Sequence, residues 1–160
     1  MYTFLDYYQK KVEFSFEKEP FLEPAKHVWI VTRYQGKWVL THHKKRGLEF
    51  PGGKVEEQES LEQAARREVK EEIGGEVDLL HYVAQYKVED QPPIIKAIFF
   101  AEVTRLVNQP HYFETNGPCL VSGDLLAERH RDTYSFIMKD DVLIHVLNYW
   151  HQQIKKEKTK

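Results

Sequence analysis

The amino-acid sequence predicts an α/β protein, a sandwich of helices around a central mixed β-sheet. Segments typical of β-strands lie on both sides of one amphipathic helix, and a second helix is expected near the C-terminus. Neither an internal repeat nor a linker divides the chain, and 160 residues suffice for one domain with its own apolar core. We therefore expect a single domain over residues 1–160, with a frayed polar tail over residues 155–160.

The first part of the chain contains four short segments rich in β-branched and aromatic residues. These predicted strands are residues 11–16, 27–34, 37–42 and 48–50. Gln35-Gly36 separates the second and third segments and indicates a hairpin. Two prolines between residues 17 and 24 predict a loop after the first strand.

The central helix is predicted over residues 60–73. Its apolar residues recur every four positions and form one stripe: Leu61, Ala65, Val69 and Ile73. Ser60 is a suitable N-cap, with Gln63 three residues later, and Gly74-Gly75 ends the helix.

The second half of the chain predicts two long strands and one more helix. Residues 76–88 and 94–106 are the strands, separated by a turn at residues 90–93. The helix is expected over residues 140–154, where Asp140 can cap its first turn. Its predicted buried face consists of Val142, Leu143, Val146, Leu147, Trp150 and Ile154.

The composition excludes several classes of protein. Charged residues make up 30% of the chain, but the signs nearly balance to a net charge of −2, which gives no support for binding nucleic acid through bulk charge. Cys119 is the only cysteine, so an internal disulfide is excluded. No segment approaches the roughly 18 apolar residues that a membrane span requires. We expect a soluble cytoplasmic protein.

Three closely spaced carboxylates indicate what chemistry the protein can perform. Glu68, Glu71 and Glu72 share one face of the predicted helix, beside its apolar stripe. Such carboxylates repel one another, and a bound cation would remove that repulsion. Ligands that are all oxygen favour a hard ion, so the cluster predicts Mg²⁺, with Mn²⁺ able to substitute.

The segment over residues 53–75 resembles the signature of the Nudix hydrolases, G-x5-E-x7-R-E-U-x-E-E-x-G-U, where U is a bulky apolar residue. The matching residues are Gly53, Glu59, Arg67, Glu68, Val69, Glu71, Glu72 and Gly74. The last position departs from the signature, because Gly75 stands where the family has a bulky residue. We expect slightly looser packing there and intact chemistry.

The resemblance implies the Nudix α/β/α sandwich and a Mg²⁺-dependent pyrophosphohydrolase. Residues 48–54, LEFPGGK, resemble the entry to this motif in the MutT-like branch, and the whole chain is similar to bacillar proteins of the 8-oxo-dGTP diphosphatase type. The expected reaction converts nucleoside triphosphates, including oxidised ones, to monophosphate and pyrophosphate. An RNA 5′-pyrophosphohydrolase is the alternative, and a non-catalytic nucleotide-binding module is the second.

The family pattern also implies roles for individual residues. Glu71 and Glu72 match metal ligands, Glu68 matches a carboxylate that orients water or shares a metal, and Arg67 can hold a carboxylate in place. The backbone carbonyl of Gly52 or Gly53 matches a further ligand. A last acidic residue is expected after the long strands, and we favour Glu114 over Glu102. Which of Glu68, Glu71 and Glu114 is the general base stays open.

Four residues are candidates for substrate binding: His43, Phe50, Lys54 and Lys139. Lys54 and the loop around His43 follow short strands that end at one edge of the sheet, where they could meet phosphate oxygens. Lys139 lies just before the last helix, where MutT-like enzymes place groups that recognise the base. Base preference and oligomeric state stay open.

Overall fold

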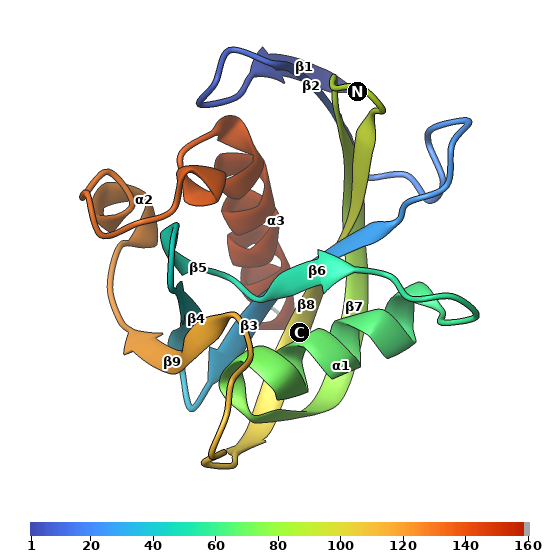
Figure 1. Ribbon diagram of the computed structural model, residues 1–160. Coiled ribbons are helices and arrows are strands. Elements are labelled where there is room, and N and C mark those ends of the chain that lie inside the picture. The colour runs from blue at the N-terminus through green and yellow to red at the C-terminus, as the bar shows by residue number, and fades with distance from the viewer. Residues whose placement is uncertain (159–160) are drawn as a thin grey trace.

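The computed structural model describes residues 1–158 as one mixed sheet with helices on both faces (Figure 1). The sheet contains nine strands: β1 (Tyr2–Leu5), β2 (Lys11–Ser15), β3 (His27–Tyr34), β4 (Lys37–His43), β5 (Gly47–Glu49), β6 (Gly52–Lys54), β7 (Gly75–Val88), β8 (Ile94–Leu106) and β9 (Thr115–Val121). Two α-helices form the outer layers, α1 (Leu61–Ile73) and α3 (Asp141–Lys158). This arrangement confirms the predicted fold class.

The strand order is β1-β2-β7-β8-β3-β4-β5, with β6 paired to β3 and β9 paired to β4. The sheet is mixed because β3 and β8 are parallel, whereas β7 and β8 form a long antiparallel pair. Strand β3 pairs with both β6 and β8. The pairing with β6 places the loop between β6 and α1 over the centre of the sheet.

Two apolar clusters fill the space on either side of the sheet. One contains the buried face of α1 together with residues of β3 and β8, such as Ile30 and Phe99. The other contains the buried face of α3 together with Trp29, Trp38 and Phe50. The amphipathic patterns of the two helices thus correctly predict the faces that they bury.

Helix α1 begins and ends as the sequence predicts. The Ser60 hydroxyl accepts the backbone N–H of Gln63 at 3.0 Å, and the Gln63 side chain accepts the backbone N–H of Ser60 at 2.8 Å. Gly74 adopts a left-handed conformation with φ 68°, which closes the C-terminus of the helix. These caps fix the helix that carries the three glutamates.

The expectation of looser packing at Gly75 is wrong. A Cβ atom at this position would lie 2.7 Å from Cγ1 of Val69 and 3.3 Å from Cγ1 of Val103. The exit from α1 is therefore packed too closely for any side chain, and glycine at this position permits the close contact between α1 and β8.

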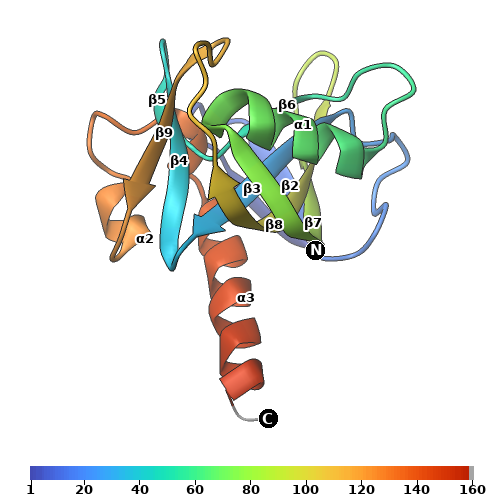
Figure 2. The same cartoon turned by 90° about the horizontal axis from the view of Figure 1, so that it is seen from below.

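Helix α3 is longer than expected, covering residues 141–158 rather than 140–154. Asp140 caps it by accepting the backbone N–H of Val142 at 2.9 Å. Figure 2 shows its C-terminal half projecting beyond the sheet. The helix therefore includes residues 155–158 of the expected frayed tail, and residues 159–160 lie outside the described part of the chain.

Several short elements were not predicted: β1, β6, β9, the helix α2 (Leu125–Glu128) and the 3₁₀ helix η1 (Phe136–Met138). Glu114 lies directly before β9. Within residues 1–158, no helix has both the length and the apolar composition needed to cross a bilayer.

Candidate active site

A cavity of about 520 Å³, called here the carboxylate cavity, lies between α1, β6 and the segment before β9. Its lining brings together five glutamates and four basic side chains: Glu56, Glu68, Glu71, Glu72, Glu114, His27, Arg46, Lys54 and Arg67. These residues come from segments that are far apart in the sequence but meet at one edge of the sheet. The three helix glutamates point into it because they flank the buried apolar stripe of α1.

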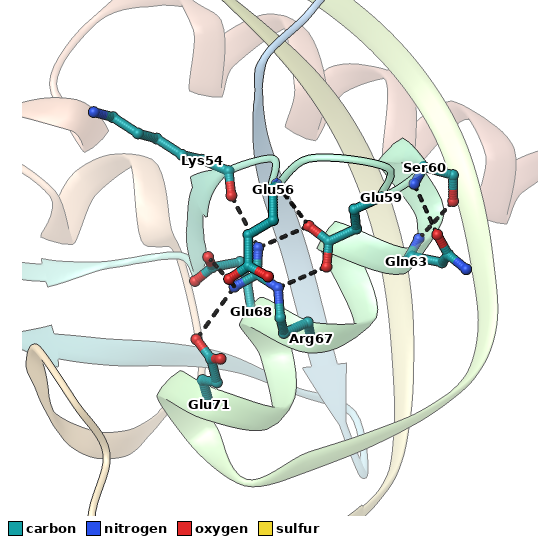
Figure 3. Close-up of polar contacts among 8 residues, drawn as sticks. All are labelled: Lys54, Glu56, Glu59, Ser60, Gln63, Arg67, Glu68 and Glu71. Atoms are coloured by element: carbon teal, nitrogen blue, oxygen red, sulfur yellow. Dashed lines mark hydrogen bonds and ion pairs between the residues drawn. The ribbon is translucent and has the colours of Figure 1, made fainter.

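Arg67 organises the acidic side chains along this wall (Figure 3). Its Nε lies 2.7 Å from Oε2 of Glu59, and its Nη1 lies 2.8 Å from Oε1 of Glu68 and 3.3 Å from Oε2 of Glu71. It also donates to the backbone carbonyl of Lys54 at 2.9 Å. The hydrogen bonds from Arg67 lower the pKa of Glu59 to about 2, so this pair stays charged over the physiological pH range. Arg67 therefore fixes α1 relative to the loop before it.

Glu68 and Glu72 are buried carboxylates on adjacent turns of α1, with exposed fractions of 8% and 9%. Burial raises the pKa of Glu72 to about 9, and the negative charge of Glu68 adds to the effect. Burial also raises the pKa of Glu68. Carboxylates arranged in this way are costly to ionise together unless a positive charge compensates them.

Backbone and hydroxyl groups hold Glu72 in position. Its Oε1 accepts the backbone N–H of Gly52 at 3.0 Å. Its carbonyl oxygen accepts the hydroxyls of Thr41 and Thr115, each at 3.1 Å. Strands β4, β6 and β9 thus all anchor the last turn of α1, which fixes the direction of the Glu72 carboxylate.

The chemistry of these donors fits a divalent metal cofactor. The candidate ligands are all oxygen, and the buried carboxylate of Glu72 forms no ion pair within the described part of the chain, whereas Glu68 is paired with Arg67. Among the described residues, however, no three acidic, histidine or cysteine side chains converge on a single point. Arg67 takes up oxygens of Glu68 and Glu71, so binding an ion requires these side chains to reorient.

Glu114 and Glu102, the two candidates for the last acidic residue, lie in different places. Glu114 lines the carboxylate cavity together with Glu68, Glu71 and Glu72. Glu102 lines a separate cavity with Arg33 and Trp150, on the face covered by α3. Only Glu114 therefore shares a cavity with the glutamates of α1.

The side chain of His43 stabilises the loop that contains Lys44, Lys45 and Arg46. The Nδ1 atom of His43 accepts the backbone N–H groups of Lys45 and Arg46, at 3.2 and 3.1 Å. Arg46 in turn makes a 2.7 Å ion pair with the buried Glu49. Of the residues expected to bind substrate, Lys54 lies in the carboxylate cavity, whereas His43 stabilises the turn that positions Arg46.

A second cavity of about 250 Å³, called here the adjoining cavity, shares His27, Arg46, Gly52 and Gly53 with the carboxylate cavity. Phe50 lines it, as do several residues that the sequence did not single out: Trp29, Glu49, Ile94, Lys96, Phe136 and Ile137. Lys139 does not line either cavity, and its Nζ lies 5.9 Å from the ring of Tyr7.

Two buried nitrogens in the adjoining cavity have no hydrogen-bond partner among the described residues, Nδ1 of His27 and Nε1 of Trp29. Burial lowers the pKa of His27, and the charges of Lys96 and Lys54 lower it further, so its neutral form is favoured. Burial also lowers the pKa of Lys96. Both nitrogens are shielded from solvent, so a ligand in the cavity could pair with them only if neighbouring side chains moved.

Comparisons with known proteins agree with this geometry. The model of the NUDIX domain matches residues 22–153. The Bacillus subtilis (strain 168) protein "Putative 8-oxo-dGTP diphosphatase YtkD" is 52% identical over 145 residues, 89% of this chain and 91% of the relative. A crystal structure of the Bacillus subtilis pyrophosphohydrolase BsRppH, in a variant with one glutamate replaced by alanine, has a TM-score of 0.89 and 47% identity, covering 96% of this chain and 98% of that one. A NUDIX hydrolase from Nitrosomonas europaea shares the fold, with a TM-score of 0.65 and 19% identity, covering 82% and 90% of the two chains.

Proposed function

The chain belongs to the NUDIX hydrolase family, and from this premise we propose that it hydrolyses the 5′-triphosphate of a nucleotide to a monophosphate and pyrophosphate. The observation that carries the proposal is the carboxylate cavity, whose lining combines five glutamates with Lys54, Arg46 and His27. Hydrolases of this family generally use divalent metal ions. We assign Mg²⁺ to this chain, with Mn²⁺ able to substitute.

The glutamates of α1 are the residues that would hold the metal. Glu68, Glu71 and Glu72 are the proposed side-chain ligands, with a backbone carbonyl of Gly52 or Gly53 beside them. Bound Mg²⁺ supplies positive charge that polarises phosphate oxygens and offsets the charge of the leaving pyrophosphate. The protein positions two of these carboxylates. Arg67 donates to Glu68, and the backbone N–H of Gly52 donates to Glu72.

Other side chains of the cavity have separate roles in the proposed reaction. Lys54 and Arg46 contact phosphate oxygens, because both line the cavity and, within residues 1–158, neither forms an ion pair with a glutamate of α1. Glu114 or one of the helix glutamates accepts the proton of the attacking water. The nucleoside occupies the adjoining cavity, whose lining includes the aromatic residues Trp29, Phe50 and Phe136.

Free nucleotides, including oxidised ones such as 8-oxo-dGTP, are the first candidate substrates, supported by the name of the relative YtkD. Triphosphorylated RNA ends are the second candidate. The similarity to the pyrophosphohydrolase BsRppH over almost the whole of both chains favours them. Both candidates present the same triphosphate to the same carboxylates.

The test is to incubate the protein and Mg²⁺ with dGTP, 8-oxo-dGTP and a short triphosphorylated RNA, and to separate the products by ion-exchange chromatography. We expect a monophosphate product from at least one substrate, and the ratio of the three rates ranks the candidates. Glu57, an exposed residue of the loop before α1, provides a matched control as Glu57→Gln. The proposal fails if no triphosphate is hydrolysed, or if Glu72→Gln retains the rate of Glu57→Gln.

A further inference from the structure

The segment between β8 and β9 supplies hydrogen-bond donors to the C-terminus of α1 (Figure 1). The last carbonyl groups of a helix have no partner within the helix, so other parts of the chain must provide their donors. The side-chain amide of Gln109 donates to the carbonyl of Glu71 at 3.4 Å, and the hydroxyl of Thr115 donates to that of Glu72 at 3.1 Å. The backbone of two proposed metal-binding glutamates is therefore tied to the segment that contains Glu114.

The hydroxyl of Thr115 joins this helix end to the turn over residues 112–115. Thr115 is buried, with an exposed fraction of 3%. Its Oγ1 lies 3.1 Å from the carbonyl oxygen of Glu72 and 3.3 Å from that of Tyr112, and it accepts the backbone N–H of Gly117 at 3.2 Å. A threonine hydroxyl has one proton and two lone pairs, so these contacts use it both as donor and as acceptor. One side chain thus connects α1, the turn and β9.

The same turn holds the backbone of Glu114 on both sides. Phe113 adopts a left-handed conformation with φ 63°, which is rare for a bulky residue and persists only where the surroundings impose it. Lys44 donates through its Nζ to the carbonyl of Phe113 at 3.1 Å and through its backbone N–H to the carbonyl of Glu114 at 3.3 Å. The side chain of Glu114 lines the carboxylate cavity. Its position therefore depends on how this turn is fixed to the rest of the protein.

Thr41 provides a direct comparison with Thr115, because its hydroxyl donates to the same carbonyl of Glu72, also at 3.1 Å. Thr41 is buried on β4, and its hydroxyl also lies 3.5 Å from the carbonyl of Gly117. Within residues 1–158, its side chain makes no hydrogen bond to the turn over residues 112–115. Loss of either hydroxyl removes a donor from the end of α1, but only loss of the Thr115 hydroxyl also releases the turn.

We propose that Thr115 is a positioning residue, whose hydroxyl sets the place of the Glu114 carboxylate relative to the last turn of α1. This inference rests on the proposed triphosphate hydrolysis and adds that Thr115 affects turnover through Glu114. Without the hydroxyl, the turn loses its link to the carbonyl of Glu72, whereas the helix end keeps the donor from Thr41. The Glu114 carboxylate then leaves the position in which it serves the reaction.

The experiment is a double-mutant cycle between Thr115 and Glu114. Thr115→Val keeps the branched shape and removes the hydroxyl, Thr115→Ser restores the hydroxyl, and Thr41→Val is the matched control. Each substitution is made in wild type and in the Glu114→Gln variant. The readouts are kcat and KM for the triphosphate that wild type hydrolyses fastest, and the affinity for a non-hydrolysable triphosphate analogue measured by calorimetry. The urea midpoint in metal-free buffer measures folding separately from activity.

We expect Thr115→Val to lower kcat roughly ten- to a hundredfold, with KM and the analogue affinity changed by less than about threefold. Thr115→Ser should restore kcat to within about threefold of wild type. Thr41→Val should lower the urea midpoint by an amount similar to Thr115→Val but lower kcat much less. In the Glu114→Gln background, Thr115→Val should change the remaining kcat by less than about twofold, because the group that it positions is already inactive.

Equal losses of kcat in Thr115→Val and Thr41→Val would overturn the inference, since both would then act only through the helix end. So would losses that multiply in the Thr115→Val, Glu114→Gln double variant, or a wild-type kcat in Thr115→Val. If Thr115→Val does not fold, Thr115→Ala removes the same hydroxyl from a smaller side chain, and the same cycle applies. These outcomes require an active wild type, whereas a wild type that hydrolyses no triphosphate would overturn the proposed function itself.

Discussion

Gly53 and Glu68 approach each other so closely that a side chain at position 53 would displace the Glu68 carboxylate. A Cβ atom on Gly53 would lie 2.4 Å from Oε1 of Glu68 and 2.6 Å from its Cδ. The contact joins β6 to α1 at the wall of the carboxylate cavity. The glycine that opens the family signature therefore leaves room for the carboxylate of a glutamate fifteen positions later.

Gly53→Ala should lower activity strongly while the protein still folds. The added methyl group displaces the Glu68 carboxylate, and we expect kcat to fall by at least about tenfold. Gly123→Ala is a control for stability, because Gly123 has φ 94° and nothing within 4 Å of an added Cβ. That control should lose about 1 kcal/mol of unfolding free energy and keep its activity. Steady-state kinetics and urea unfolding of both variants check the prediction, which is wrong if Gly53→Ala turns over like wild type.

Glu71→Gln and Glu72→Gln should each reduce turnover by at least about a hundredfold, since each removes a charged oxygen proposed to hold the metal. In metal-free buffer the unfolding free energy of either variant should equal or exceed that of wild type, because repulsion among the carboxylates is relieved. Kinetics with Mg²⁺ and thermal unfolding with EDTA measure the two effects separately. Rates near wild type from either variant would mean that the ligands lie elsewhere.

Glu114→Gln should lower kcat strongly and change substrate affinity only a few-fold, because Glu114 lines the carboxylate cavity. Glu102→Gln should be nearly silent, since Glu102 faces Arg33 in a different cavity. Loss of Glu114 should slow dGTP and triphosphorylated RNA by similar factors if it serves the shared chemistry alone. The reverse ranking of the two variants would reverse the assignment.

Asp140 predicts a pH dependence of stability. Burial raises its pKa to about 7 from the usual 3.8, although the charges of Lys96 and Arg129 act in the opposite direction and that of Asp6 adds to the rise. The folded protein therefore binds this proton more tightly than the unfolded chain. Its contribution to stability is fully present below pH 3.8 and is lost as the pH rises through about 7.

The Asp140→Asn variant isolates this effect, because asparagine can still accept the N–H of Val142. The stability of wild type relative to the variant should fall by on the order of 2–4 kcal/mol between pH 4 and pH 8, at about 1.4 kcal/mol per pKa unit. Urea unfolding at a series of pH values measures the difference. A difference that does not change with pH would show that Asp140 titrates normally.

Much of the fold follows from local patterns. The apolar stripe of α1, its Ser60 cap and the hairpin at Gln35-Gly36 all depend on neighbours within a few residues, and the structure confirms them. The strands β1, β6 and β9 were missed because they are short and are stabilised by pairing with distant strands. Segment 115–121 contains Gly117 and Pro118, which by themselves predict a loop. The segment forms a strand because it pairs with β4.

The candidate site also has one part that local sequence patterns predict and another part that they do not. The helix glutamates and Arg67 share one segment, so their spacing is visible in the sequence. His27, Trp29 and Lys96 escaped prediction because they lie on strands β3 and β8, where they resemble ordinary strand residues. Only the parallel pairing of β3 with β8 sets His27 opposite Lys96 beside the adjoining cavity. The role of His43 was also missed, because it depends on a turn whose backbone N–H groups donate hydrogen bonds to the His43 ring.

The central claim is that the glutamates of α1 perform a metal-dependent hydrolysis of a 5′-triphosphate. The most direct measurement is the rate of monophosphate and pyrophosphate formation from dGTP and from a triphosphorylated RNA, with Mg²⁺, with Mn²⁺ and with EDTA. We expect hydrolysis with either metal and none with EDTA, restored when Mg²⁺ is added back. Undiminished hydrolysis in EDTA would contradict the account.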